Sequence, residues 1–124
     1  FYLHVGGILI DSRAHDNLLD ETLDQTLKFG DAVGAALDFA KKDGRTLVVV
    51  TADHDTGGLS VVDGTVDGAV LKVTWGGDNH TGEAVPLFAF GPGAGLFGGF
   101  KDNTEIPLIF ARLIGAADFP KISE

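Results

Sequence analysis

The chain has 124 residues, of which 44% are hydrophobic, so it is the size of one domain that can bury a core. Its 18 acidic and 9 basic residues give a net charge of −9, which argues against a nucleic-acid partner because phosphate backbones need Lys and Arg to neutralise them. There is no Cys, which excludes disulfides and thiolate metal ligands. No segment approaches the roughly 20 apolar residues of a membrane span, and the sequence shows no signal peptide.

The first half of the chain predicts a strand, a helix and a second strand. Residues 1–5 are an apolar strand that ends at Gly6-Gly7, followed by a loop from Asp11 to His15. Asp16 or Asn17 can cap a helix that runs to about Lys42. Residues 46–51 contain Leu-Val-Val-Val, which is typical of a strand buried on both faces.

The second half predicts a hairpin, a strand and a last helix. Valines broken by Asp-Gly pairs at about 59–75 indicate hairpin strands outside the main sheet. Residues 86–90 are another buried strand, and 91–95 are a glycine-rich turn that lacks the Lys of a phosphate-binding loop. Asn103 or Thr104 caps a helix that ends near Gly115, and the tail from Ala116 is expected to fray.

Together these elements predict an α/β fold with a mainly parallel sheet flanked by helices. Strands 1–5, 46–51 and 86–90 form the sheet, and the hairpin is a small excursion from it. Phe1 starts within an apolar strand, so we expect the chain to begin inside a folded domain; the plainer alternative is an edge strand at a true terminus.

Five residues have the types and spacing of metal ligands. Carboxylates and neutral imidazoles suit zinc and similar divalent ions, and three of the four His lie in the short motifs concerned. We expect these motifs to converge at one sheet edge, where loops leave the carboxyl ends of the strands. The predicted ligands are Asp11, His15, Asp53, His54 and His80.

Each motif also has a plainer interpretation. Asp11 and His15 are four residues apart, and that pattern is common by chance, although on a helix both side chains would share one face. Polar residues after a strand, such as Asp53-His54, often cap or turn the chain, and a single His80 is more often a surface residue. The prediction of a metal site therefore depends on these motifs occurring together in one chain.

Taken in order, the motifs resemble the carboxy-terminal part of alkaline phosphatases. The matching stretches include Ile-Asp-x-x-x-His, Thr-Ala-Asp-His-x-Thr-Gly-Gly, His-Thr-Gly-Glu and Asp-Asn-Thr-Glu-Ile, and they cover nearly the whole chain. The resemblance implies that residues 1–124 are the carboxy-terminal portion of a single alkaline-phosphatase-like domain, a partial sandwich whose amino-terminal half is absent.

The resemblance also implies a two-zinc hydrolase of phosphate monoesters. Asp11, His15 and His80 would ligate one zinc, and Asp53 and His54 would contribute to the second. The family's serine nucleophile and phosphate-binding Arg come from its amino-terminal half. This chain therefore contains no catalytic nucleophile, and the isolated chain is predicted to be inactive.

Further family properties follow as expectations. The family's magnesium site usually has Glu at the position of Gly6, which has no side chain, so a complete Mg²⁺ site is doubtful here. The expected partners are small phosphate monoesters, the amino-terminal part of the same protein and a second copy in a homodimer. The expected location is periplasmic or extracellular.

Two alternatives remain open at this point. Phosphoglycerate mutases and phosphodiesterases of the same superfamily share the Asp-x-x-x-His, Asp-His and His ligands, although the Thr-Gly-Gly and Thr-Gly-Glu continuations favour the phosphatase. A non-catalytic metal-binding module is the alternative from a different class. Such a module would bind zinc and fold alone without hydrolysing anything.

Overall fold

The computed structural model describes residues 1–116 and 118–120. The chain divides into two compact units. The first contains Phe1–Gly34 and His54–Val85, and the second contains Ala35–Asp53 and Pro86–Glu124.

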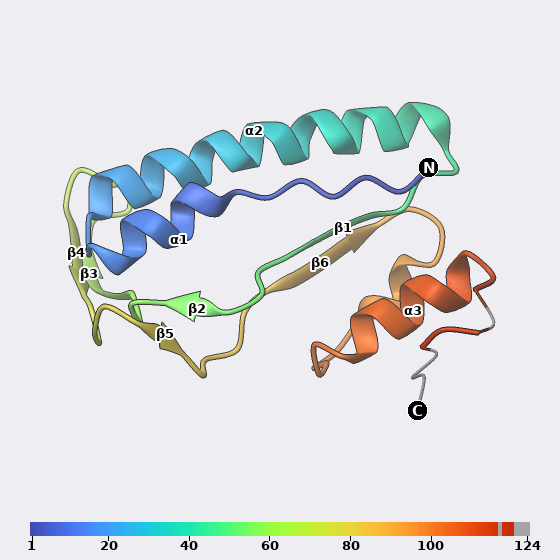
Figure 1. The fold of residues 1–124 in the computed structure, drawn as a ribbon. Helices are drawn as coiled ribbons and strands as arrows, with labels where there is room; N and C mark the ends of the chain where they lie inside the picture. The colour runs from blue at the N-terminus through green and yellow to red at the C-terminus, as the bar shows by residue number, and fades with distance from the viewer. Residues whose placement is uncertain (117, 121–124) are drawn as a thin grey trace. The chain divides into compact units, whose positions relative to one another are not determined.

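Two helices begin the first unit. Helix α1 spans Ile8–His15, and α2 spans Leu19–Asp43, of which the amino-terminal part belongs to this unit (Figure 1). Asn17 lies in the turn between them with a φ of 55°, a left-handed conformation that Asn tolerates better than most residues. Gly7 enters α1 so close to α2 that a Cβ there would lie 2.9 Å from the Phe29 ring. The absence of a side chain thus lets the two helices approach each other.

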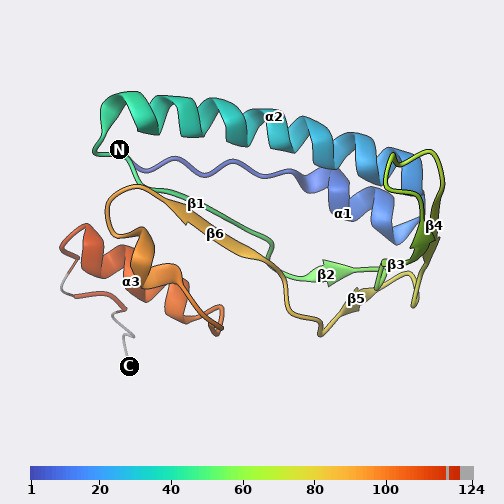
Figure 2. The same cartoon turned by 180° about the vertical axis from the view of Figure 1, so that it is seen from behind.

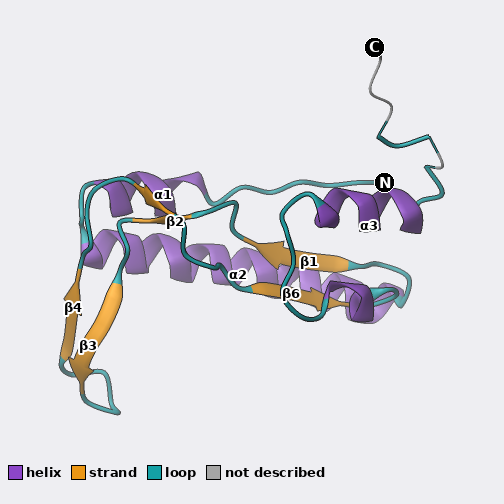
Figure 3. Ribbon diagram, turned by 90° about the horizontal axis from the view of Figure 1, so that it is seen from below, coloured by secondary structure: helices purple, strands orange, loops and turns teal. Residues whose placement is uncertain are grey.

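Two antiparallel strand pairs complete the first unit. Strand β2 (Asp55–Thr56) pairs with β5 (His80–Thr81), and the two strands are only two residues long. Strands β3 (Ser60–Gly64) and β4 (Leu71–Thr74) form a hairpin that extends from the rest of the unit (Figure 3). The hairpin predicted at 59–75 is therefore confirmed.

The second unit is built on the antiparallel pair of β1 (Val48–Thr51) and β6 (Leu87–Phe90), seen from behind in Figure 2. A 3₁₀ helix, η1 (Ala94–Phe97), follows β6 and contacts both β6 and helix α3 (Glu105–Leu113). The ring of Phe97, which is buried, lies 5.3 Å from the ring of Phe110. This aromatic pair joins η1 to α3.

The prediction of a mainly parallel sheet is wrong. All the strand pairs in the described residues are antiparallel, including β1 with β6, where Val48 lies opposite Phe90 and Thr51 opposite Leu87. Along β6, half-buried and exposed residues alternate, as expected for a strand covered on one face. An apolar run reports that a strand can be buried, but it does not specify the direction of its partner.

The prediction of a strand at residues 1–5 is also wrong. Residues 1–7 contain no helix or strand, and Phe1, Leu3 and Val5 are 98%, 73% and 57% exposed. A strand exists only through ladder hydrogen bonds to a neighbour, and an apolar sequence does not supply that neighbour.

The remaining local predictions have mixed outcomes. The segment 11–15, predicted as a loop, is helical, whereas the predicted helices at 17–42 and 104–115 are confirmed as α2 and α3. Thr104 is the N-cap of α3 but makes no side-chain cap bond; its own N–H instead donates to the Asp102 carboxylate. The turn at 91–95 leads into η1, and part of the predicted tail lies outside the described residues. Within the described part of the chain, no helix is both long enough and apolar enough to cross a membrane.

A carboxylate at the end of α2 allows a prediction about how the stability of the fold depends on pH. The Asp43 carboxylate accepts hydrogen bonds from the Thr46 hydroxyl (2.7 Å) and the Arg45 N–H (3.2 Å), and the Thr46 bond is the main reason that the pKa of Asp43 is lowered. A lowered folded-state pKa stabilises the fold above the unfolded value of about 3.9, and this stabilisation is lost as pH falls through the folded value. We expect Thr46→Val to raise the pKa of Asp43, measured by NMR titration, and to reduce stability at pH 7.

The control is to compare the unfolding free energies of the parent and of Thr46→Val at low pH. Once Asp43 is protonated in both, the difference in unfolding free energy between the parent and Thr46→Val should shrink. A difference that is the same at pH 7 and at a pH where NMR shows Asp43 protonated in both proteins would show that the ionised carboxylate does not contribute through this hydrogen bond.

Candidate metal centre

Helix α1 places two of the predicted ligands on one face. Asp11 and His15 are separated by four residues, slightly more than one helical turn, so their side chains lie beside each other. The distance from Asp11 Oδ1 to His15 Nε2 is 3.4 Å. The shared face proposed for a helical Asp11–His15 segment is therefore confirmed.

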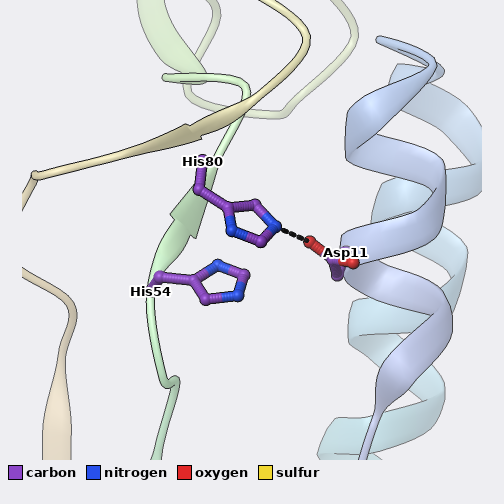
Figure 4. A group of neighbouring side chains, drawn as sticks. All are labelled: Asp11, His54 and His80. Carbon is purple, nitrogen blue, oxygen red and sulfur yellow. Dashed lines mark ion pairs between the residues drawn. The ribbon is translucent and has the colours of Figure 1, made fainter.

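The β2–β5 pair supplies two more imidazoles. The chain bends at 53–54, so His54 leaves strand geometry immediately before β2, and His80 is the first residue of β5. Their rings stack with centroids 3.5 Å apart. Figure 4 shows both rings extending towards Asp11 on α1, His80 from β5 and His54 from the bend just before β2.

Three potential ligand atoms form a nearly equilateral triangle. Asp11 Oδ1 lies 3.4 Å from both His15 Nε2 and His80 Nε2, and the two nitrogens are 3.2 Å apart. A tetrahedral zinc ion with ligand bonds of about 2.0–2.1 Å has its ligand atoms about 3.3–3.4 Å apart. The triangle therefore matches one face of a zinc coordination tetrahedron.

A backbone carbonyl fixes the tautomer of His15. The Nδ1 of His15 lies 2.6 Å from the carbonyl oxygen of Asp78, which can only accept a hydrogen bond. Nδ1 must therefore carry a proton, and in a neutral imidazole Nε2 then has a free lone pair directed at the triangle. Metal-ligating histidines are held in the same way, with the second ring nitrogen donating to a carbonyl or carboxylate.

A buried threonine hydroxyl orients the carboxylate. Thr56, 8% exposed, donates a hydrogen bond from Oγ1 to Asp11 Oδ1 at 2.6 Å, and its hydroxyl is also 3.3 Å from His54 Nδ1. This bond is the main cause of the lowered pKa of Asp11; burial opposes it, and His15, His80 and His54 lower the pKa further. Asp11 is therefore ionised at neutral pH, which is the form that binds a cation.

Four of the five predicted ligands lie in the first unit. Asp11, His54 and His80 also form a group in which one potential ligand atom from each residue lies within 4.8 Å of the others. Asp53 belongs to the second unit, although it directly precedes His54 in sequence. The convergence occurs between α1 and the β2–β5 pair, and not at the edge of a parallel sheet as predicted.

Several residues around the cluster were not predicted from the sequence. Thr56 is not among the predicted ligands, yet its hydroxyl contacts Asp11 and His54. Asp78 contributes its backbone carbonyl oxygen. Because every residue has a backbone carbonyl, the residue type gives no indication of this role. The position of Thr56, two residues after the predicted ligand His54, was the one available indication, because metal-binding carboxylates are usually held by hydrogen bonds from neighbouring groups.

Comparison with known proteins identifies the family of the chain. The family model described as alkaline phosphatase matches residues 1–71, which is more than half of the chain. The chain belongs to the alkaline phosphatase family. The resemblance inferred from the motifs is thereby confirmed.

Individual members of the alkaline phosphatase family match most of the chain. An alkaline phosphatase from Escherichia fergusonii is 38% identical over 122 residues, and a streptomycin-6-phosphate phosphatase from Streptomyces griseus is 40% identical over 123 residues. Each match covers 86% of this chain but 26% and 27% of the relative, so the chain spans about a quarter of their length.

Solved structures of alkaline phosphatases share the fold. The alkaline phosphatase from the Antarctic bacterium TAB5 superimposes with a TM-score of 0.80 at 34% identity, over 88% of this chain and 34% of that one. A mutant of the same enzyme, with Mg bound in its M3 site, gives the same score at 36% identity. The fold of this chain is thus that of a portion of an alkaline phosphatase, built from helices and small antiparallel sheets.

Proposed function

We propose that this chain supplies zinc ligands to the metal centre of an enzyme that hydrolyses phosphate monoesters. The observation that carries the proposal is the triangle of Asp11 Oδ1, His15 Nε2 and His80 Nε2, with sides of 3.2–3.4 Å. Family membership supports the phosphatase chemistry. In this proposal Asp11, His15 and His80 hold one zinc ion, and Asp53 and His54 contribute to a second.

The chain's own residues would prepare this site for a cation. Thr56 directs the Asp11 carboxylate, and the Asp78 carbonyl holds His15 with Nε2 free to ligate. Zinc bound there would polarise a phosphoryl oxygen and generate a nucleophilic hydroxide, the general role of such ions in phosphatases. The exposed side of the cluster, where His80 is 49% exposed, would admit substrate.

Zinc binding is the direct test of the site. Calorimetric titration of the metal-free protein should show zinc binding, and cobalt substitution should give the visible spectrum of a tetrahedral ion. If the protein binds neither ion at micromolar concentration, the proposal fails, whatever its family.

Hydrolysis requires groups that we propose lie in the amino-terminal part typical of the family. Ser12, Arg13 and Ser60 are not in the family's nucleophile motif. A metal can polarise a phosphate without positioning it for in-line attack by a nucleophile. We therefore expect the 124-residue chain alone to bind zinc but not to hydrolyse a chromogenic phosphate monoester. Zinc-dependent turnover by this chain alone, removed by a chelator and restored by zinc, would contradict the prediction.

The remaining expectations rest on family resemblance. A Mg²⁺ site would lack the carboxylate usual at Gly6. Among the described residues, a Cβ at this position would come within 4 Å only of Ile8 Cγ2, at 3.5 Å, so Gly6→Glu has room to restore the carboxylate. We propose a homodimer, with the amino-terminal part of the same protein as the other partner. The proposed location is periplasmic or extracellular.

A further inference from the structure

A carboxylate on β2 connects the two strands next to the stacked histidines. Asp55 Oδ2 accepts a hydrogen bond from the Thr81 hydroxyl at 2.6 Å and another from the Gly58 N–H at 3.0 Å. Asp55 directly follows His54, and Thr81 directly follows His80. We call the Asp55–Thr81 hydrogen bond, together with the Gly58 bond, the brace.

The brace lies on the strand face opposite the candidate metal centre. Asp55 is paired with Thr81 and Thr56 with His80 in the β2–β5 ladder. Because successive side chains in a strand point to opposite faces, the first pair shares one face and the second pair the other. Thr56 and His80 both contact Asp11, so their face is the one that carries the centre. Asp55 therefore supports the ligands from behind.

The short ladder explains why a side-chain connection matters here. Strands of two residues are too short to fix the separation of their ends through backbone pairing alone. Charge-assisted hydrogen bonds such as that from Thr81 to Asp55 are stronger than neutral ones. The second bond, from Gly58, also holds the turn that follows β2 in place.

We propose that the brace is a positioning device that sets the separation of His54 and His80 for metal binding. The inference rests on the proposed function, because the separation matters chemically only if the imidazoles bind metal. Asp55 and Thr81 are positioning residues, which would act through the neighbouring histidines without contacting the ion.

Zinc affinity in brace variants is the first measurement. Thr81→Val removes the hydroxyl at nearly constant volume, and Asp55→Ala removes the acceptor. Each substitution should weaken zinc binding about tenfold, which is at the lower end of the loss usually seen when a residue that supports a metal ligand is removed. Thr81→Ser and Asp55→Asn, which keep a donor and an acceptor respectively, should recover most of the affinity. The double variant should be no weaker than Asp55→Ala, because both changes remove the same bond.

Asp63 offers a matched control on the hairpin. Its carboxylate also accepts a hydrogen bond from a cross-strand side chain, Lys72 at 2.9 Å, and another from a glycine N–H, Gly64 at 2.9 Å. Asp63→Ala should leave zinc affinity and the cobalt spectrum unchanged, whereas Thr81→Val should alter both. The inference is overturned if Thr81→Val binds zinc as tightly as the parent, or if Asp63→Ala weakens binding equally.

Hydrogen exchange without metal separates failure of this inference from failure of the proposed function. Loss of the brace in Asp55→Ala should accelerate exchange of the Gly58 amide but not that of the β3–β4 amides. If the parent binds no zinc, the proposed function fails, whereas slow Gly58 exchange that depends on Asp55 would still support the part of the brace that holds the turn after β2. Unchanged Gly58 exchange in Asp55→Ala overturns the brace in either case.

Discussion

Replacing Asp11 by Asn is expected to reduce zinc affinity by at least about a hundredfold, more than the loss of a supporting partner usually costs. The substitution keeps the shape of the side chain but removes the negative charge that lies 3.4 Å from both His15 Nε2 and His80 Nε2. His80→Ala should have a comparable effect, because it removes a vertex of the same triangle. Competition with a chromogenic chelator measures both.

A carboxylate elsewhere in the first unit provides the control. Asp24 pairs with Lys28 on the exposed surface of α2 at 2.6 Å, so Asp24→Asn changes the net charge of the protein by the same amount as Asp11→Asn. Its zinc affinity should match that of the parent. Zinc binding by Asp11→Asn within threefold of the parent would show that the triangle is not the binding site.

Replacing Gly57 by Ala is expected to destabilise the protein by about 3 kcal/mol, through left-handed backbone strain and overpacking together. Gly57 has a φ of 80°, and a Cβ there would lie 2.6 Å from Trp75 Cε3 and 3.1 Å from the Ala14 carbonyl oxygen. Thr56, which orients Asp11, is the preceding residue, so zinc affinity should fall as well. Thermal unfolding followed by the fluorescence of the single Trp measures the change in stability.

The same substitution at Gly30 should have the opposite sign. Gly30 is exposed within α2, and apart from its own helix neighbours no group in the described part of the chain lies within 4 Å of the position of a Cβ. Gly30→Ala should therefore stabilise the protein by about 0.5–1 kcal/mol through helix propensity. Equal effects of the two substitutions would mean that the close packing of Trp75 on Gly57 does not constrain the fold.

The sequence by itself determined the elements whose signals are local. The apolar stripe and terminal residues of α2, the Asp-Gly turns of the hairpin and the strands at 48–51 and 87–90 are each encoded within a short segment. Residue types alone also identified Asp11, His15, His54 and His80 as a candidate ligand set, because few side chains bind divalent cations.

Only the tertiary structure decided which segments pair and in which direction. The apolar run of β1 is compatible with either orientation of a neighbour, and its antiparallel pairing with β6 depends on contacts between residues some 40 positions apart. The supporting contacts of Thr56, Asp78 and the brace likewise join distant segments. A sequence pattern reports the period and polarity of one segment. Partners, directions and hydrogen-bond distances depend on the packing of several segments at once.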